Sequence, residues 1–171
     1  MHRTLLIASA LLMGVLGVPV SQDPVQPQCK VIWLIGAPCT DVFMTVVNQI
    51  KAWTGTTSCE LGGENCMYEL ESVTPLVVKA TKTSPSTMNM SNLTLTMSPI
   101  EDPSICRVTG DAISESWTSP LDNGMNYCSL EDLIIGSGLN NTLGFKEFTS
   151  NWICLGYTLG SCTVTSLNRK I

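Results

Sequence analysis

Eight cysteines limit what this 171-residue chain can fold into more than any other feature. An even number of cysteines in an exported chain predicts a framework of disulfides. The sequence contains no C-x-x-C spacing of the kind found in zinc knuckles and redox motifs, which disfavours a thiolate metal site. We therefore predict four structural disulfides among Cys29, Cys39, Cys59, Cys66, Cys106, Cys128, Cys154 and Cys162.

The pairing of these cysteines is only partly readable from the sequence, because eight cysteines allow 105 combinations. Closeness in the chain favours two local bridges, Cys59–Cys66 and Cys154–Cys162. We predict these two pairs and leave most of the other pairings open.

The segment 41–54 carries the clearest helical pattern, with apolar residues recurring at spacings of three and four. Such a helix spans roughly 21 Å at about 1.5 Å per residue. The five residues that lead on to Cys59 reach at most about 18 Å when extended. A bridge from Cys39, which precedes the helix, to Cys59 is therefore disfavoured. We expect Cys39 to pair with a distant cysteine on the sheet or near a second helix.

The rest of the chain alternates between polar and apolar residues in short runs, as strands of a half-buried sheet do. Ser129 and Gly136 bracket a short second helix at 130–135, and a parity change at Gly110 predicts a β-bulge there. The fold class is therefore α+β, with one main amphipathic helix and a short second helix packed on a mainly antiparallel sheet. Strands are predicted at 30–35, 66–71, 76–83, 92–98, 105–117, 145–155 and 161–167.

A helix followed by antiparallel strands resembles the cystatin-like arrangement in architecture. The central glutamine–valine–glycine pattern of that family is absent from this sequence. The resemblance therefore implies no function.

The start of the chain has the pattern of a secretory signal peptide. Arg3 precedes an apolar run at 5–16, which is too short to span a bilayer. We predict a signal peptide at 1–17, a flexible leader rich in proline and glutamine at 18–28, and a single disulfide-rich domain at 29–171. The downstream sequence shows no membrane span, so the predicted localisation is secreted and extracellular.

The balance of charges excludes some classes of partner. The net charge is −5, and removal of residues 1–17 takes away Arg3 and no acid, which leaves about −6. An acidic surface disfavours nucleic acid and anionic membranes.

The chemistry of the sequence favours binding over catalysis. The single histidine, His2, lies in the predicted signal peptide, so a catalytic triad or a histidine metal site is not expected. Cysteines held in disulfides supply no thiolate nucleophile. The neighbouring acids at 101–102 and at 131–132 fit a turn and a helix first turn better than an acid–base pair. We predict no catalytic residues, no metal site, no cofactor and no enzyme activity.

Three sequons predict N-glycosylation at Asn89, Asn92 and Asn140. Alternation along 92–98 places Asn92 on the solvent face of its strand, and Asn140 lies in a glycine-rich loop. Asn89 is only three residues from Asn92, so crowding is expected to leave one of these two unmodified.

Three functions remain open at this stage. The leading interpretation is a secreted glycoprotein, stabilised by disulfides, that acts by binding an unknown extracellular protein. The second is a carrier of a small apolar ligand in a helix–sheet cavity lined by Phe43, Val47 and Trp53. The third is a hydrolase that uses only carboxylates, which two facing acids in a cleft would favour.

Overall fold

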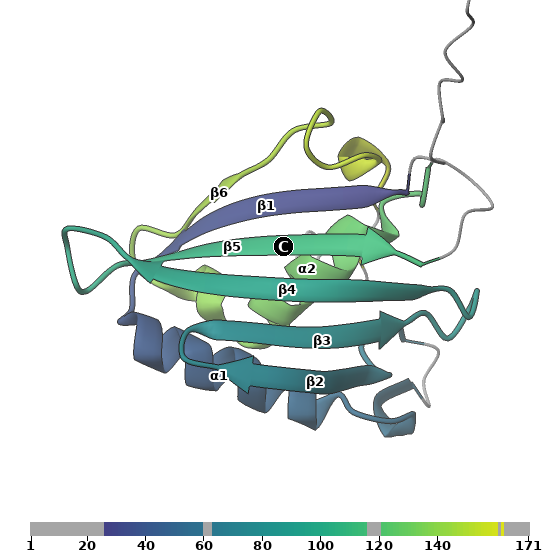
Figure 1. Cartoon of the computed structure of the whole chain (residues 1–171), viewed down its shortest axis with the longest axis horizontal. Helices are drawn as coiled ribbons and strands as arrows, with labels where there is room; N and C mark the ends of the chain where they lie inside the picture. Colours follow the sequence, from purple (N-terminus) through teal and green to yellow (C-terminus); the bar gives the residue numbers. More distant parts are fainter. Residues whose placement is uncertain (1–25, 60–62, 116–120, 161, 163–171) are drawn as a thin grey trace, which may run out of the picture.

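The computed structural model describes residues 26–59, 63–115, 121–160 and 162. Within these residues, two α-helices pack on a six-stranded antiparallel sheet, which confirms the predicted α+β class (Figure 1). The predicted signal peptide and the last predicted strand lie outside the described residues, apart from Cys162. In chain order the elements are β1 (Gln28–Ile35), α1 (Cys39–Ala52), η1 (Thr57–Cys59), β2 (Tyr68–Thr74), β3 (Val77–Thr83), β4 (Met90–Pro99), β5 (Cys106–Ser114), α2 (Met125–Gly136), η2 (Leu139–Asn141), β6 (Lys146–Phe148) and η3 (Tyr157–Leu159).

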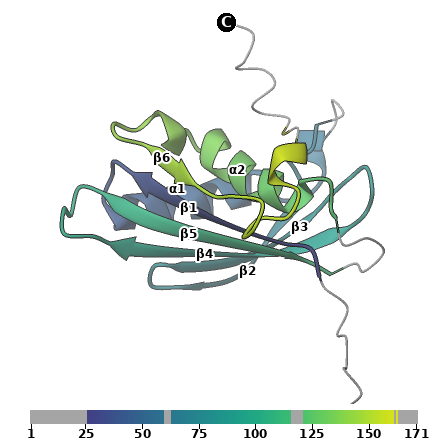
Figure 2. The same ribbon diagram turned by 90° about the horizontal axis from the view of Figure 1, so that it is seen from above.

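The strands follow the order β2-β3-β4-β5-β1-β6, and every neighbouring pair is antiparallel. Strands β2 to β5 form a meander, and the N-terminal strand β1 joins it beside β5. Both helices lie on the same face of the sheet, as the view from above shows (Figure 2). None of the described helices covers the other face of the sheet (Figure 2), and Asn92 of β4 is exposed there as predicted.

The main helix confirms the pattern read from the sequence, with its bounds shifted by two residues. α1 begins at Cys39 and ends at Ala52, where 41–54 was predicted. Its buried side chains repeat at helical spacing and face the sheet. Asp41 in the first turn and Lys51 in the last complement the helix dipole. The buried residues of α1 are Cys39, Val42, Val46, Val47 and Ile50.

The second helix is twice as long as predicted, because its N-terminal signal lies further upstream. α2 starts at Met125, and the carboxylate of Asp122 accepts hydrogen bonds from the backbone N–H groups of Gly124 (3.0 Å) and Asn126 (2.7 Å). These bonds satisfy N–H groups that a helix start leaves unpaired. Ser129 is not the cap, because it lies inside the helix and its hydroxyl donates to the Met125 carbonyl at 2.8 Å.

The predicted bulge at Gly110 is wrong. β5 pairs without a register shift to β1 and β4, and Gly110 lies opposite Val31 and Leu95. Gly110 is one of the residues of β5 that face the helices. Because glycine is not strongly apolar, the alternation of polar and apolar residues along β5 is hard to see at this position. A Cβ there would lie 2.7 Å from the Trp33 ring. The glycine therefore makes room for the tryptophan side chain across the strand.

The predicted strand at 145–155 is mostly an irregular segment. Only β6 pairs as a strand, with residues 32–34 of β1. Beyond β6 the chain stays along the same edge, where the backbone N–H of Lys30 donates to the Ile153 carbonyl at 2.7 Å. The N–H of Leu155 likewise donates to the Gln28 carbonyl at 3.1 Å.

All eight cysteines form disulfides, in the pairs Cys29–Cys154, Cys39–Cys106, Cys59–Cys66 and Cys128–Cys162. The local pair Cys59–Cys66 confirms the prediction. The pair Cys154–Cys162 is wrong, because residue 154 lies against β1 while residue 162 lies against α2. Cys39 avoids Cys59 and bonds instead to the start of β5, as the helix-length argument predicts.

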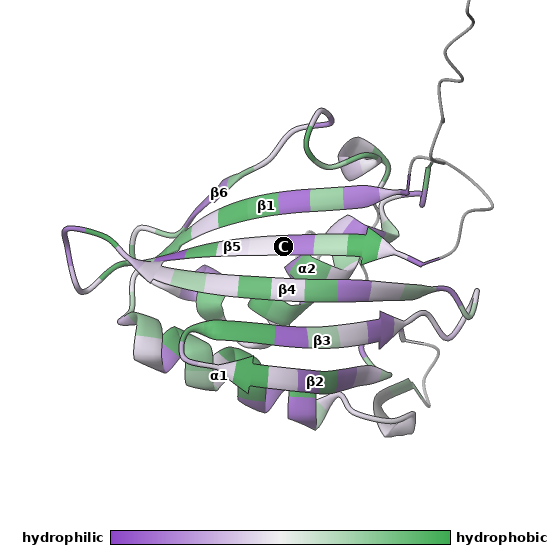
Figure 3. Ribbon diagram, in the orientation of Figure 1, coloured by the Kyte–Doolittle hydropathy of each residue, from purple (hydrophilic) through white to green (hydrophobic). Residues whose placement is uncertain are grey.

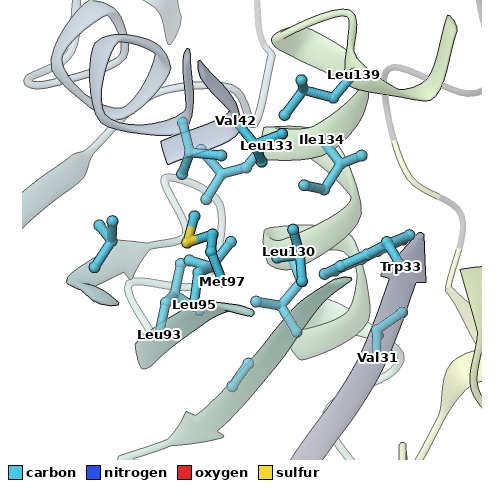
Figure 4. Close-up of a cluster of buried hydrophobic side chains, with 14 of the residues drawn as sticks. Val31, Trp33, Val42, Leu93, Leu95, Met97, Leu130, Leu133, Ile134 and Leu139 are labelled. Atoms are coloured by element: carbon cyan, nitrogen blue, oxygen red, sulfur yellow. The ribbon is translucent and has the colours of Figure 1, made fainter. Parts of the chain in front are cut away.

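The core fills the space between the helices and the sheet. Green and purple bands alternate along the strands, as expected for a sheet with one buried face (Figure 3). Leu93, Leu95 and Met97 of β4 approach Leu130 and Leu133 of α2 (Figure 4). In the described part of the chain, no helix is long and apolar enough to cross a membrane.

Candidate functional site

A polar cavity of about 290 Å³ opens at one end of the helix–sheet interface. Its walls come from the end of β3, the loop that follows it, the segment around the start of α2, the first half of α2 and the loop closed by Cys59–Cys66. The charged and hydroxyl side chains that define it are Glu64, Lys82, Ser84, Asp122, Ser129 and Asp132. We call this hollow the Lys82 cavity.

Lys82 is buried because of its position on β3. Alternation along this strand sends Val78, Ala80 and Lys82 toward the helices. The lysine is only 4% exposed, although it lines the cavity. Burial of this kind is rare for lysine unless a partner compensates its charge.

The Lys82 ammonium has three kinds of neighbour. It donates a hydrogen bond to the backbone carbonyl of Thr83 at 2.8 Å. It lies 3.7 Å from a carboxylate oxygen of Glu64, and 5.2 Å from the centre of the Tyr68 ring. Burial lowers the pKa of Lys82, and the nearby carboxylates of Glu64 and Asp132 oppose that shift.

Tyr68 is fully buried next to Lys82 and connects β2 to α2. Its hydroxyl donates to the Ser129 carbonyl at 3.0 Å. Burial raises the pKa of Tyr68 well above its ordinary value, and the charges of Asp132 and Glu64 raise it further. The phenol therefore acts as a neutral hydrogen-bond donor to the backbone of α2.

Three carboxylates face this cavity. Glu64 is held in a loop closed by Cys59–Cys66 and accepts a weak 3.4 Å hydrogen bond from the hydroxyl of Ser84. Asp132 is buried in the middle of α2, and Asp122 caps that helix. Glu64 and Asp132 both interact with Lys82, so the site combines one ammonium with two nearby negative groups.

The neighbouring acids considered as possible acid–base pairs lie in two distant parts of the structure. Asp132 lines the Lys82 cavity, within α2 and not in a helix first turn as predicted. Glu101 and Asp102 lie in the exposed turn between β4 and β5, at the opposite end of the sheet. Hydrogen bonds from the side chain and the backbone of Ser104 lower the pKa of Asp102, as in an ordinary turn.

The residues of the predicted apolar pocket line neither the Lys82 cavity nor the groove beside Trp152 described below. Val47 is buried in the core. Trp53 packs against Tyr68 with ring centres 5.5 Å apart, and it covers Gly136 so closely that a Cβ there would clash. Phe43 is half-buried against the same core. In the described structure these three side chains therefore pack in or against the hydrophobic core.

The sequon asparagines differ in exposure. Asn92 is exposed, and its amide donates to Glu115 at 3.0 Å. Asn89 is half-buried in the loop before β4. Asn140 is also half-buried, in η2, and its side-chain oxygen is buried. Of the three predicted sites, Asn92 therefore offers a glycan the easiest access.

A second hollow of about 280 Å³ lies at the N-terminal end of β1, beside the exposed side chain of Trp152. Trp152 is 95% exposed, which is unusual for so large an apolar group. The Cys29–Cys154 disulfide holds its loop against β1. Lys30 and Asp111 form an ion pair of 3.1 Å in the wall of this groove.

The Lys82 cavity was missed at the sequence level, although one signal was present. Strand alternation at 76–83 already places Lys82 on the same side as two core residues.

Among the described residues, no three ligating side chains are grouped in a way that could hold a metal ion. What the cavity offers is a set of charges and hydrogen-bonding groups for a polar molecule. No protein-family model, curated protein or solved structure matches this chain, so the argument for function rests on its own geometry.

Proposed function

We propose that this protein is an extracellular binding protein that takes up a small polar molecule in the Lys82 cavity. The observation that carries the proposal is a lysine that is 4% exposed yet lines an open cavity. Burying a charge is costly unless it is compensated, and such costs are often maintained at functional sites. The four disulfides fit a protein that works in an oxidising compartment.

Binding is favoured over catalysis by the inventory of reactive groups. The chain has one histidine, at position 2, and the described cysteines are all disulfide-bonded. The carboxylate-only hydrolase needs a proton donor and a second acid across the substrate. In the Lys82 cavity an ammonium interacts with both Glu64 and Asp132, an arrangement that favours a charged recognition site.

Ligand binding is tested on the native protein purified from the medium of secretory cells. Small molecules that stay bound are released by denaturation and identified by mass spectrometry, and their binding is measured by calorimetry. We expect a saturable ligand whose affinity falls at least tenfold in Lys82→Met. Glu69→Gln, an exposed acid on β2, is the matched control and should bind as the wild type does.

The variants also separate loss of binding from loss of folding. Glu64→Gln changes a partly exposed residue and should cost no more than about 1 kcal/mol in the free energy of unfolding while it weakens binding. Equal ligand affinity in the wild type, Lys82→Met and Glu64→Gln would contradict the proposal. Intact-mass analysis of the same material tests export and glycosylation, with loss of residues 1–17 and a glycan on Asn92 as the expected result.

A second candidate function is the docking of an extracellular protein on the groove beside Trp152. A rigidly held, exposed tryptophan is typical of the centre of a protein interface. The Lys30–Asp111 pair cancels the local charge, and the chain carries a net charge of −5, so an anionic lipid surface is disfavoured. The occupant proposed is a protein that inserts an apolar side chain.

A photo-crosslinker placed at position 152 tests this second candidate. Its products should disappear when an excess of the unlabelled wild type competes, and should persist with excess Trp152→Ala. The same crosslinker at the exposed Thr158 is the control for chance encounters. Equal competition by the wild type and Trp152→Ala would rule out the groove as the docking surface.

A further inference from the structure

We propose that the ligand of the Lys82 cavity is a small molecule carrying a protonated amino group and, on the same molecule, an oxygen that accepts hydrogen bonds. This inference rests on the proposed function and names the class of ligand for the same site. It follows from two features of the cavity: spare donor capacity at Lys82 and an excess of negative charge around it.

The donor capacity of Lys82 calls for an acceptor. An ammonium has three N–H donors. Within the described part of the chain, one of them is bound to the Thr83 carbonyl at 2.8 Å. The Glu64 oxygen at 3.7 Å attracts the charge but lies beyond the usual hydrogen-bond distance. A ligand oxygen in the cavity would accept the remaining donor capacity of this nearly buried group.

The charge of the cavity calls for a cation. Among the described lining residues, Glu64, Asp122 and Asp132 carry negative charge and Lys82 carries positive charge, which is an excess of two negative charges. Asp122 is already engaged by backbone N–H groups at the start of α2. The carboxylates that interact with Lys82 are Glu64 and Asp132. Lys82 lies 3.7 Å from Glu64, beyond hydrogen-bond distance, so a protonated amine on the ligand could bind the Glu64 carboxylate directly.

Glu64 is the group best placed to receive that amine. Its side chain is 33% exposed, so it can be reached from the open side of the cavity. Its hydrogen bond from Ser84 is long, at 3.4 Å, and can be exchanged for a stronger one. Charge-assisted hydrogen bonds between an amine and a carboxylate are shorter and stronger than neutral ones.

The same features disfavour other ligand classes. A dicarboxylate would place its negative charges against Glu64 and Asp132. A neutral polyol would satisfy Lys82 but leave the excess charge in place. An apolar ligand would offer the ammonium no acceptor beyond the Thr83 carbonyl. A cavity of about 290 Å³ lies near the lower end of the volumes of small-molecule pockets, which fits a compact ligand.

The experiment uses four five-carbon probes of nearly equal length on the disulfide-intact native chain. These are 5-aminopentan-1-ol, 1,5-diaminopentane, pentane-1,5-diol and glutarate, with affinities measured by titration calorimetry or NMR. The first carries both an amine and an oxygen. The diamine lacks the oxygen, and the diol and glutarate lack the amine. We expect 5-aminopentan-1-ol to bind about tenfold more tightly than the diamine or the diol, and glutarate to bind weakest.

Two substitutions assign the two ends of the probe. Glu64→Gln should weaken 5-aminopentan-1-ol about tenfold and leave the diol unchanged, because only the amine contact is lost. Lys82→Met should weaken the aminoalcohol and the diol but not the diamine. Glu69→Gln is the control for a general change in charge and should alter no affinity. Thermal unfolding of each variant shows whether the fold is kept.

Each outcome decides between the two proposals. Tightest binding of the diol or of glutarate would overturn the amine class while the proposed function stands. If no probe binds, the amine class is overturned. In that case a co-purified ligand that is lost in Lys82→Met would keep the proposed function, whereas its persistence in that variant would remove the function as well.

Discussion

The two ends of the helix–sheet interface beneath α2 differ in the chemical nature of the groups that they bury and in how tightly they are packed. Around Trp33 the helix–sheet interface is dry and filled, to the point that Gly110 must lack a side chain. Around Lys82 the same interface is polar and hollow. The first end stabilises the fold by burial, and the second bears the cost of buried charges.

One helix serves both ends because its faces differ. α2 presents Leu130, Leu133 and Ile134 to the apolar core. It presents Ser129 and Asp132 to the Lys82 cavity. Burial alone does not identify the structural core here, because Asp132 is about as buried as the leucines beside it. The chemical nature of the buried groups separates the two regions.

The largest effect is expected at the dry end, from Trp33→Ala. This change removes a fully buried ring and the hydrogen bond from its N–H to Glu147 at 2.8 Å. We expect a loss of roughly 3–5 kcal/mol in the free energy of unfolding, measured by urea denaturation. Trp152→Ala is the matched control, because an exposed tryptophan should cost less than about 0.5 kcal/mol. Similar losses for both would mean that the interior near β1 is not the stabilising core.

The second-largest loss of stability is expected when a disulfide is removed, and each region of the molecule offers one disulfide for comparison. Cys39–Cys106 joins α1 to β5 across 67 residues, whereas Cys59–Cys66 closes a loop of 7 residues next to Glu64. The chain-entropy model gives about 4 kcal/mol for the long loop and roughly 2–3 kcal/mol for the short one. Paired serine substitutions, followed by urea denaturation, measure both.

The two serine variants should also differ in function. Loss of Cys59–Cys66 should weaken ligand binding more than it weakens the fold, because Glu64 loses its anchor. Loss of Cys39–Cys106 should affect stability first. A reversed pattern would contradict the division of the molecule into a stabilising end and a binding end.

The dry end could largely be predicted from the sequence, because it obeys simple periodicity. The apolar repeat of α1 and the alternation in β4 gave the right elements and the right buried faces. The failures there have local causes. Gly110 interrupts the hydropathy pattern because it yields its space to Trp33, and Asp122 caps α2 from a position that resembles a loop.

The polar end could not be predicted in the same way, because its partners come from four separate segments. Strand alternation places Lys82 inward, but nothing in the sequence brings Glu64 or Asp132 beside it. The disulfides show the same limit. The short loop of Cys59–Cys66 is readable, whereas Cys29–Cys154 depends on where the C-terminal segment runs along β1.

A third prediction uses alkaline pH to compare two buried tyrosines, one from each region. Tyr68 lies next to Lys82, and Tyr127 donates to Glu147 beside Trp33. Burial raises the pKa of both above their ordinary value of 10.0. Above this pH the unfolded chain releases protons that the folded chain keeps. The free energy of unfolding should therefore fall as pH rises, by at most about 1.4 kcal/mol per pH unit for each group.

Lys82 adds a contribution of the opposite sign. Its folded pKa is lowered from 10.5, so the unfolded chain holds that proton more tightly. Lys82 should therefore make stability rise with pH between its folded pKa and 10.5, and above pH 10.0 the two tyrosines oppose that rise. Urea denaturation between pH 9 and 11 measures the profile. Lys82→Met should lose the rise, and Tyr68→Phe and Tyr127→Phe should each make the fall shallower. An unchanged profile in all three variants would contradict these assignments.

The smallest effect is the direct coupling between Lys82 and Glu64, and it tests most sharply whether the polar end is a stabilising device. The two groups are 3.7 Å apart, but Glu64 is one-third exposed, so water and salt screen the pair. A double-mutant cycle with Lys82→Met and Glu64→Gln should give a coupling energy of about 0.5–1 kcal/mol that shrinks in high salt. Unfolding in urea of the wild type, the two single variants and the double variant supplies the four free energies. A coupling above about 2 kcal/mol, insensitive to salt, would show an ion pair that holds the fold together, and the cavity would then be part of the core. A small coupling would mean that the buried charge of Lys82 is poorly compensated by its own chain, as a site that completes its charge balance with a ligand requires.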